Sequence, residues 1–160
     1  MNDLTSRALE LQHAAHELMY LGMDGEPVYS DTFCWLNKEV LVKSDSLFFA
    51  QSSDVEEEAN LCLALLMGYN ATIYDDGDKE QKKQMVLNRI CLVLEQLPAS
   101  LLKVRLLTYT YGEVYEEVLL QEAYAIIEGW NKDNLTSGQT EIIEELKNIE
   151  ENPYPFEEVE

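Results

Sequence analysis

The sequence predicts an all-α protein, with about seven helices that pair as antiparallel hairpins. Apolar residues recur at helical spacing, and nearly all of the four prolines and seven glycines lie between the periodic segments. No stretch alternates apolar and polar residues as a half-buried strand would. Because the loops are short, consecutive helices are expected to be antiparallel neighbours. Two architectures stay open, a compact bundle and a short stacked array of helical hairpins.

The first fifty residues are predicted to form two helices. The first, over residues 3–21, is expected to end at Gly22 and has one apolar row, formed by Leu4, Ala8, Leu11, Ala15 and Leu18. The second, over residues 30–49, has a main apolar row formed by Phe33, Leu36, Val40 and Leu47. A second row lies almost opposite and contains Trp35, Val42 and Phe49. Either this helix lies between two neighbours, or the second row receives a partner.

Two capping boxes predict where the third and fourth helices start. Ser53 with Glu56 fits one box, for a helix that ends near Tyr74, and Asp78 with Gln81 fits the other. The middle of the third helix reads LCLALLMG and is apolar all round. Such a helix has no face suited to water, so we expect it at the centre of the domain.

The remaining helices are predicted from the same signals. Pro98 suits the first turn of a fifth helix, and Gly112 lies near its expected end. A sixth helix is expected over residues 113–130, and Thr136 with Gln139 fits a capping box for a seventh. We therefore expect one all-helical domain over residues 1–151. An extended acidic tail follows over residues 152–160, where two prolines oppose helix formation.

The charge balance excludes several classes of partner. The 160 residues contain 31 acidic and 11 basic side chains, which gives a net charge of −20. Such a surface repels nucleic-acid phosphates and anionic lipids, so we expect neither direct nucleic-acid binding nor membrane binding. The longest apolar run, residues 61–67, is too short to span a bilayer, and no secretory signal is visible. These features predict a cytoplasmic protein.

The sequence offers few residues for catalysis. The three cysteines, Cys34, Cys62 and Cys91, form no CxxC pair and are expected to be small buried side chains in a reducing compartment. The only histidines are His13 and His16, beside Glu17. They would supply a metal site only if the three side chains converged, and helical spacing instead places the histidines on the water-facing side of the first helix. No nucleophile or phosphate-binding motif is present, so we expect a protein that is not an enzyme and holds no cofactor.

Aromatic and acidic side chains are the candidate contacts for a protein partner. Tyrosine and tryptophan combine an apolar ring with a polar tip, which suits interfaces, although the tyrosines from Tyr109 to Tyr124 would equally pack between the fifth and sixth helices. The proline-rich tail is either a solvated end or a short docking peptide with two aromatic anchors. The candidate protein-binding residues are Trp35, Val42, Phe49, Tyr109, Tyr111, Tyr115, Tyr154, Phe156, Glu157 and Glu158.

Four segments, spread over almost the whole chain, resemble the UpxZ family of capsule-locus regulators from gut commensal bacteria. They are ELMYLGMDGEPVYSDTF (17–33), EEEANLCLALLMGYNATIYDDGDKE (56–80), LPASLLKVRLLTYTYGEVYEE (97–117) and ENPYPFEEVE (151–160). The resemblance implies an antagonist of transcription antitermination. Its partners would be NusG-like antiterminators of the UpxY type, bound either free or within the RNA polymerase elongation complex. Each antagonist would inhibit the antiterminators of capsular polysaccharide loci other than its own. A small acidic helical chaperone for a secreted or assembled client is the alternative interpretation of the same sequence.

Overall fold

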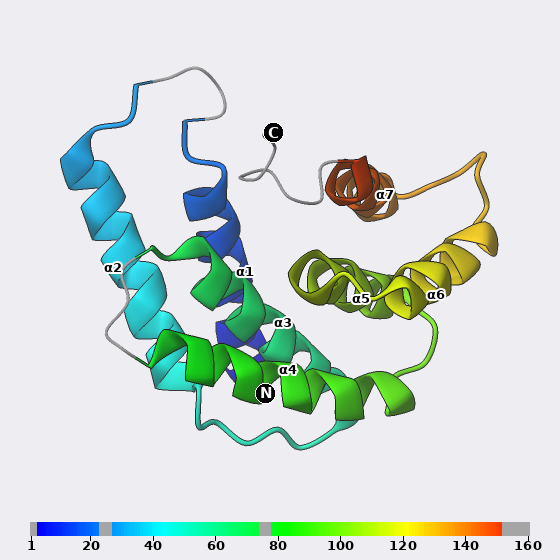
Figure 1. The fold of residues 1–160 in the computed structure, drawn as a ribbon, viewed down its shortest axis with the longest axis horizontal. Coiled ribbons are helices and arrows are strands. Elements are labelled where there is room, and N and C mark those ends of the chain that lie inside the picture. Colours follow the sequence, from blue (N-terminus) through cyan, green and yellow to red (C-terminus); the bar gives the residue numbers. More distant parts are fainter. Residues whose placement is uncertain (1–2, 23–26, 74–77, 152–160) are drawn as a thin grey trace. The chain divides into compact units, whose positions relative to one another are not determined.

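The computed structural model describes residues 3–22, 27–73 and 78–151, and in these residues it contains helices and no strand (Figure 1). The predicted all-α class is therefore confirmed. The helices are α1 (Asp3–Met19), α2 (Ser30–Leu47), α3 (Val55–Ala71), α4 (Lys79–Gln96), α5 (Leu101–Val114), α6 (Glu117–Glu128) and α7 (Ser137–Glu151). Contacts group the chain into two compact units, Met1–Leu97 and Pro98–Glu160, and the single domain over residues 1–151 stays a prediction. None of the described helices is long and apolar enough to cross a membrane.

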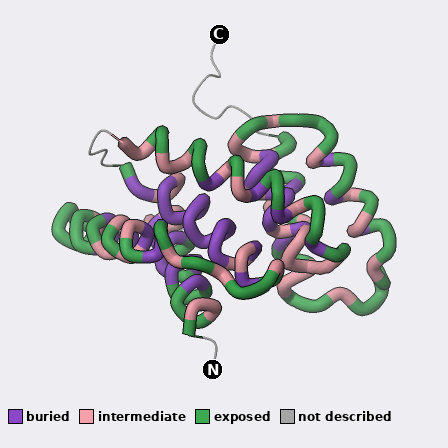
Figure 2. Tube along the Cα trace, turned by 90° about the horizontal axis from the view of Figure 1, so that it is seen from below, coloured by how far each residue is buried: buried purple, intermediate pink, exposed green. Residues whose placement is uncertain are grey.

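The first unit is built around α3, which contacts α1, α2 and α4. Every residue from 61 to 69 is buried, as expected for a helix that is apolar on all sides. The predicted row on α1 also lies in the core, with Ala8, Leu11, Ala15 and Leu18 buried. Figure 2 shows buried residues on the inward sides of the helices and exposed residues on their outward sides. The prediction that the third helix is central is confirmed.

The tightest approach in this unit lies between α2 and α3. A Cβ atom placed on Gly68 would lie 2.1 Å from Ser44 Oγ, far inside van der Waals contact. Ser44 is itself buried, and its hydroxyl donates to the Val40 carbonyl at 2.9 Å. The absence of a side chain at position 68 is therefore what lets the buried hydroxyl of α2 fit against α3.

Hydrogen bonds at the helix starts confirm one predicted cap and correct two. In α7, Thr136 N donates to Gln139 Oε1 at 2.9 Å, and Gln139 N donates to Thr136 Oγ1 at 3.1 Å, a complete capping box. In α3 the cap is Asp54 rather than Ser53, because Asp54 Oδ1 accepts from Glu57 N at 2.8 Å. In α5 it is Ser100, whose hydroxyl accepts from Lys103 N, so Pro98 lies before the helix.

The fourth helix begins where predicted, but its cap works differently. Asp78 occupies the N-cap position, yet its side chain makes no cap hydrogen bond. It instead pairs with Lys82 one turn later, at 3.5 Å. The helix therefore starts where the predicted capping box with Gln81 placed it, but the predicted cap hydrogen bond to the Asp78 side chain is not made. Gly22 has the positive φ of 87° that its predicted role at the end of α1 requires.

In the second unit, α5 contacts α6 and α7. Gly112 lies near the end of α5, as predicted, and the helix continues to Val114. The end is formed by Tyr115, which adopts a left-handed conformation with φ of 55°. A left-handed non-glycine residue is uncommon and costs free energy, which neighbouring contacts must offset. The Tyr115 ring packs edge-on against the Tyr111 ring with 5.4 Å between centroids, and this contact helps hold the turn into α6.

Candidate protein-interaction surface

Large apolar side chains are exposed on the outer side of α2 and in the turn that follows it. Trp35 is 66% exposed, Val42 57% and Phe49 81%. The opposite side of the helix packs against α1 and α3 and buries Leu36, Val40 and Leu47. In the described structure α2 is therefore packed on one side only, and its second apolar row faces outward.

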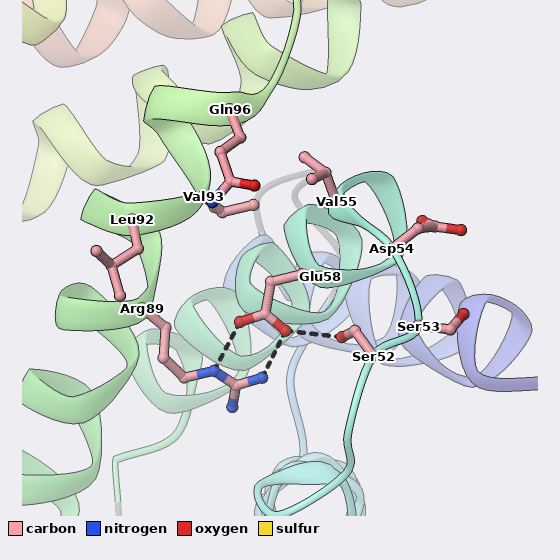
Figure 3. Close-up of a pocket in the computed structure, with 9 residues that line it drawn as sticks. All are labelled: Ser52, Ser53, Asp54, Val55, Glu58, Arg89, Leu92, Val93 and Gln96. Carbon is pink, nitrogen blue, oxygen red and sulfur yellow. Dashed lines mark hydrogen bonds and ion pairs between the residues drawn. The ribbon is translucent and has the colours of Figure 1, made fainter.

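Two hollows open beside this row, between α4 and the segment of residues 48–55. Their volumes are about 350 Å³ and about 450 Å³, and they share Ser52, Glu58 and Arg89 (Figure 3 shows the first). We call the combined depression the Arg89 groove and define it by Phe49, Ser52, Glu58, Met85, Arg89 and Leu92.

The groove follows from the spacing of residues along α4. Met85, Arg89 and Leu92 lie four and three residues apart, so they share one face of the helix. Val86, Ile90 and Val93 form the adjacent face and are buried, where α4 packs against α3. Packing of the inner face therefore turns two apolar side chains and one arginine toward the segment that contains Phe49.

Arg89 and Glu58 join the two sides of the groove. Arg89 Nε donates to Glu58 Oε2 at 2.8 Å, and its terminal nitrogen donates to Glu58 Oε1 at 2.7 Å. Ser52 Oγ donates to the same carboxylate at 2.7 Å from the other side (Figure 3). Arg89 also donates to the Phe48 carbonyl. This bidentate pair fixes α4 against α3 and against the segment beside Phe49.

The environment of Glu58 keeps this carboxylate charged. Partial burial raises its pKa, but the hydrogen bonds from Arg89 and Ser52 outweigh burial, so the pKa lies below its ordinary value of 4.5. The hydrogen bonds to Glu58 also raise the pKa of Arg89. Both groups are therefore ionised over the whole neutral range.

Removing the arginine should destabilise the first unit. In Arg89→Met, Glu58 stays partly buried without its charged partner, and we expect a loss of about 2 kcal/mol in the free energy of unfolding at neutral pH. Urea denaturation measures this loss. Because the pair lowers the Glu58 pKa, its stabilisation is present above pH 4.5 and disappears as pH falls through the folded pKa, so the two proteins should converge in acid. Lys43→Met, which breaks the more exposed pair with Glu39, is the control. An equal loss of stability in Arg89→Met and Lys43→Met would contradict the conclusion that the Arg89–Glu58 pair stabilises the first unit.

The exposed face of α4 is unusually free of charge for this protein. From residue 81 to residue 92 its exposed side chains are all uncharged, namely Gln81, Gln84, Met85, Asn88, Cys91 and Leu92. Cores of protein interfaces are depleted in Lys, Glu and Asp and enriched in aromatic residues, Met and Arg. The Arg89 groove combines Phe49, Met85 and Arg89, three residue types that are enriched in interface cores, with one carboxylate, Glu58, whose charge Arg89 balances.

The candidate tyrosines pack among the three helices of the second unit. Tyr111 is buried, and Tyr109 and Tyr115 are half-buried. Tyr124, on α6, donates to Glu150 Oε1 of α7 at 2.8 Å. These rings therefore contribute to packing in the described structure. The predicted anchors of the tail, Tyr154 and Phe156 with Glu157 and Glu158, lie outside the described residues and stay predictions.

Two tyrosines in this unit should ionise late. Burial, with nearby glutamates, raises the pKa of Tyr109 to about 12. Burial and the hydrogen bond to Glu150 raise that of Tyr124 to about 12. Since the folded pKa values are raised, these groups stabilise the fold below pH 10 and destabilise it progressively as pH rises toward and through 12. An absorbance titration of tyrosinate should show a step above pH 10 in the folded protein. Tyr124→Phe should make this step smaller. In urea the step should move to the ordinary tyrosine pKa of 10. A single step near pH 10 in the folded protein would contradict this.

The polar candidates of the sequence are dispersed. His13, His16 and Glu17 are exposed on α1, and no group of three or more potential metal ligands converges within the described part of the chain. The prediction that all three cysteines are buried is wrong for two of them. Cys62 is buried, whereas Cys34 and Cys91 are exposed because they lie on the outward faces of α2 and α4.

The aromatic, methionine and arginine side chains of the Arg89 groove are of the types enriched in protein-binding surfaces. Comparison with known proteins gives the family of the chain. The UpxZ family of transcription anti-terminator antagonists matches residues 8–112. A crystal structure of a transcription anti-terminator antagonist UpxZ from Bacteroides uniformis ATCC 8492 is 67% identical, with a TM-score of 0.88 and coverage of 99% of each chain. No curated protein matches. The chain belongs to the UpxZ family, and its class is a regulatory antagonist of transcription anti-terminators.

Proposed function

We propose that this chain inhibits NusG-like antiterminators of the UpxY type that serve capsular polysaccharide loci other than its own. Inhibition would occur in the cytoplasm by direct protein–protein binding, without a chemical step. The membership of the chain in the antagonist family, over residues 8–112, is the observation that carries this proposal. The resemblance of segments along almost the whole chain supports the capsular context.

Charge would bring the two proteins together. Residues 1–97 contain 17 acidic and seven basic side chains, and residues 98–160 contain 14 and four, so each unit has a net charge of −10. A protein of this charge associates faster with a basic surface than with a neutral one. Proteins that work beside nucleic acid commonly carry such a surface. Charge alone attracts every basic homologue, so it cannot select between antiterminators.

Selection would come from the Arg89 groove. Leu92 is 64% exposed and Phe49 more so, while Arg89 and Glu58 hold the floor of the groove in one geometry. Apolar anchors that fit a shaped depression discriminate between related partners by several kcal/mol through close packing. We therefore assign the contact with the antiterminator to this groove.

Binding to purified antiterminators tests the proposal. The antiterminators of other capsule loci should bind the chain and the one from its own locus should not, and raised salt should slow association. Leu92→Lys should abolish binding, whereas Val118→Lys should not, although Val118 on α6 is equally exposed at 63%. In a transcription assay that measures readthrough, Leu92→Lys should no longer inhibit the antiterminator, whereas Val118→Lys should still inhibit it. Failure to bind any antiterminator would overturn the proposal, and binding that both variants retain would overturn the assignment to the groove.

A further inference from the structure

Two residues of the chain between α2 and α3 run along the Arg89 groove without backbone partners. The N–H and carbonyl groups of Gln51 and Ser52 make no hydrogen bond to any residue that the structure describes, whereas the flanking Ala50 and Ser53 N–H groups both donate. Figure 3 shows the chain at Ser52 and Ser53 as an uncoiled trace beside the floor of the groove. This short edge is therefore open to main-chain hydrogen bonds from a bound segment.

Arg89 also has donors that the described residues do not use. A guanidinium group carries five N–H hydrogens in a fixed plane. Two of them donate to Glu58 and a third donates to the Phe48 carbonyl, which leaves two. The Arg89 side chain is 29% exposed and lines both hollows of the groove. A bound segment can therefore place a hydrogen-bond acceptor between the two hollows.

These unused groups favour an extended segment over a helix as the occupant of the groove. Inside a helix the backbone N–H and carbonyl groups bond to one another, so a helix laid in the groove would leave the edge and Arg89 unpaired. An extended segment presents both kinds of group along its sides. Its backbone can therefore pair with the edge and offer a carbonyl to Arg89 at the same time.

The two hollows suit the side chains of such a segment. Phe49 and Met85 line one hollow, and Val55 and Leu92 line the other, so both have apolar walls. The hollows are neighbours because they share the residues around Arg89. In an extended chain the side chains of alternate residues point the same way and lie about 7 Å apart. Two apolar side chains separated by one residue can therefore enter the two hollows together.

The charge around the groove indicates what flanks these two side chains. Asp54 is exposed and lines one hollow, and Glu95 is exposed next to another lining residue of that hollow, Gln96. Apart from Arg89, whose charge Glu58 balances, no basic residue lines either hollow of the described structure. A segment with a neutral centre and basic ends is complementary to these surroundings, whereas one that offered Arg89 a carboxylate would be repelled.

We propose that the Arg89 groove binds an extended segment of the antiterminator, with two apolar side chains separated by one residue at its centre and basic residues at its ends. The backbone of this segment hydrogen-bonds to Gln51 or Ser52, and one of its carbonyls accepts from Arg89. This inference rests on the proposed function, which assigns the antiterminator to the groove, and it adds the form of the segment that the groove recognises.

Selection of random short peptides displayed on phage against the full-length chain tests the inference without the antiterminator. The enriched peptides should share the apolar pair with basic flanks. Their affinity should fall at least tenfold for Leu92→Lys and stay unchanged for Val118→Lys, a substitution at an equally exposed position on α6. Circular dichroism should show that both variants keep the wild-type helix content. Enrichment of no peptide, or of peptides that bind both variants equally, would overturn the inference.

Methylation of single backbone nitrogens in an enriched peptide distinguishes the two conformations. In an extended chain, the N–H groups that face the edge and those that face away belong to alternate residues. Methylation should therefore weaken binding at least tenfold at one central position and much less at the two positions beside it. The exchange of the Gln51 or the Ser52 amide hydrogen should also slow at least tenfold when the peptide binds. Losses at every central position, with unchanged exchange at both amides, would indicate a helix and overturn the inference.

Displacement of the same peptide separates this inference from the proposed function. A purified non-cognate antiterminator should displace the peptide from the chain. An antiterminator that binds the chain and leaves the peptide in place would overturn the inference, while the antagonist function would stand. If no antiterminator binds but the peptide does, the proposed function fails, and only the source of the segment is wrong.

Discussion

Gly68→Ala is expected to destabilise the first unit by about 3 kcal/mol, at the upper end of what overpacking of a core costs. The added methyl group would lie 2.1 Å from Ser44 Oγ and 3.5 Å from Leu11 Cδ1, so either α2 and α3 separate or the Ser44 hydroxyl leaves its hydrogen bond to Val40. Both neighbours are buried and cannot turn away into solvent. Urea denaturation followed by circular dichroism measures the loss.

A matched control and a rescue make this expectation specific. Gly112→Ala also adds a methyl group within a helix, but its nearest neighbour, Ile149 Cδ1, is 3.4 Å away. Alanine favours helix over glycine by about 1 kcal/mol, so this variant should be neutral or more stable. Adding Ser44→Ala to Gly68→Ala removes the clashing oxygen and should recover most of the stability. If the double variant is no more stable than Gly68→Ala, the close contact is not the cause.

Phe49→Ala is expected to have the largest effect on binding among truncations to alanine in the groove. The ring is 81% exposed, so its loss should change the free energy of unfolding by less than about 0.5 kcal/mol. Loss of an aromatic anchor from an interface typically costs about 2 kcal/mol or more, so affinity for a non-cognate antiterminator should fall about thirtyfold. Isothermal titration calorimetry with the purified antiterminator measures the change.

Trp35→Ala separates the Arg89 groove from the rest of the exposed face of α2. Trp35 does not line the groove, so this substitution should leave the affinity for the antiterminator unchanged. Equal losses of target binding in Trp35→Ala and Phe49→Ala would show that the antiterminator covers the whole face of α2 instead of the groove.

Hydrophobic periodicity predicted much of the helical frame. The apolar run of residues 61–68 predicted the central helix because a helix without a polar face has to be buried. The Trp35 row was visible as a second stripe, but spacing cannot say whether a neighbour covers it. The cap at Asp54 was missed by one residue because Ser53 and Asp54 are both good cap residues and only the hydrogen bond to Glu57 N decides between them.

The groove was less accessible to sequence reasoning. Met85 and Leu92 lie seven residues apart, among glutamine and asparagine residues. In the sequence, each therefore looks like a single apolar residue on the surface, which needs no explanation. Arg89 and Glu58 are 31 residues apart, so their pairing depends on how α3 and α4 pack. Gly112 does lie near the end of α5, but the residue that ends the helix is Tyr115, and a tyrosine in the left-handed conformation carries no sequence signal.

The contacts of Arg89 tie recognition to folding. Arg89 donates to Glu58 of α3 and to the Phe48 carbonyl, so the groove exists only while α3 and α4 are packed together. A chain whose first unit has come apart would therefore lose the recognition surface together with its core, and only intact molecules would compete for a target.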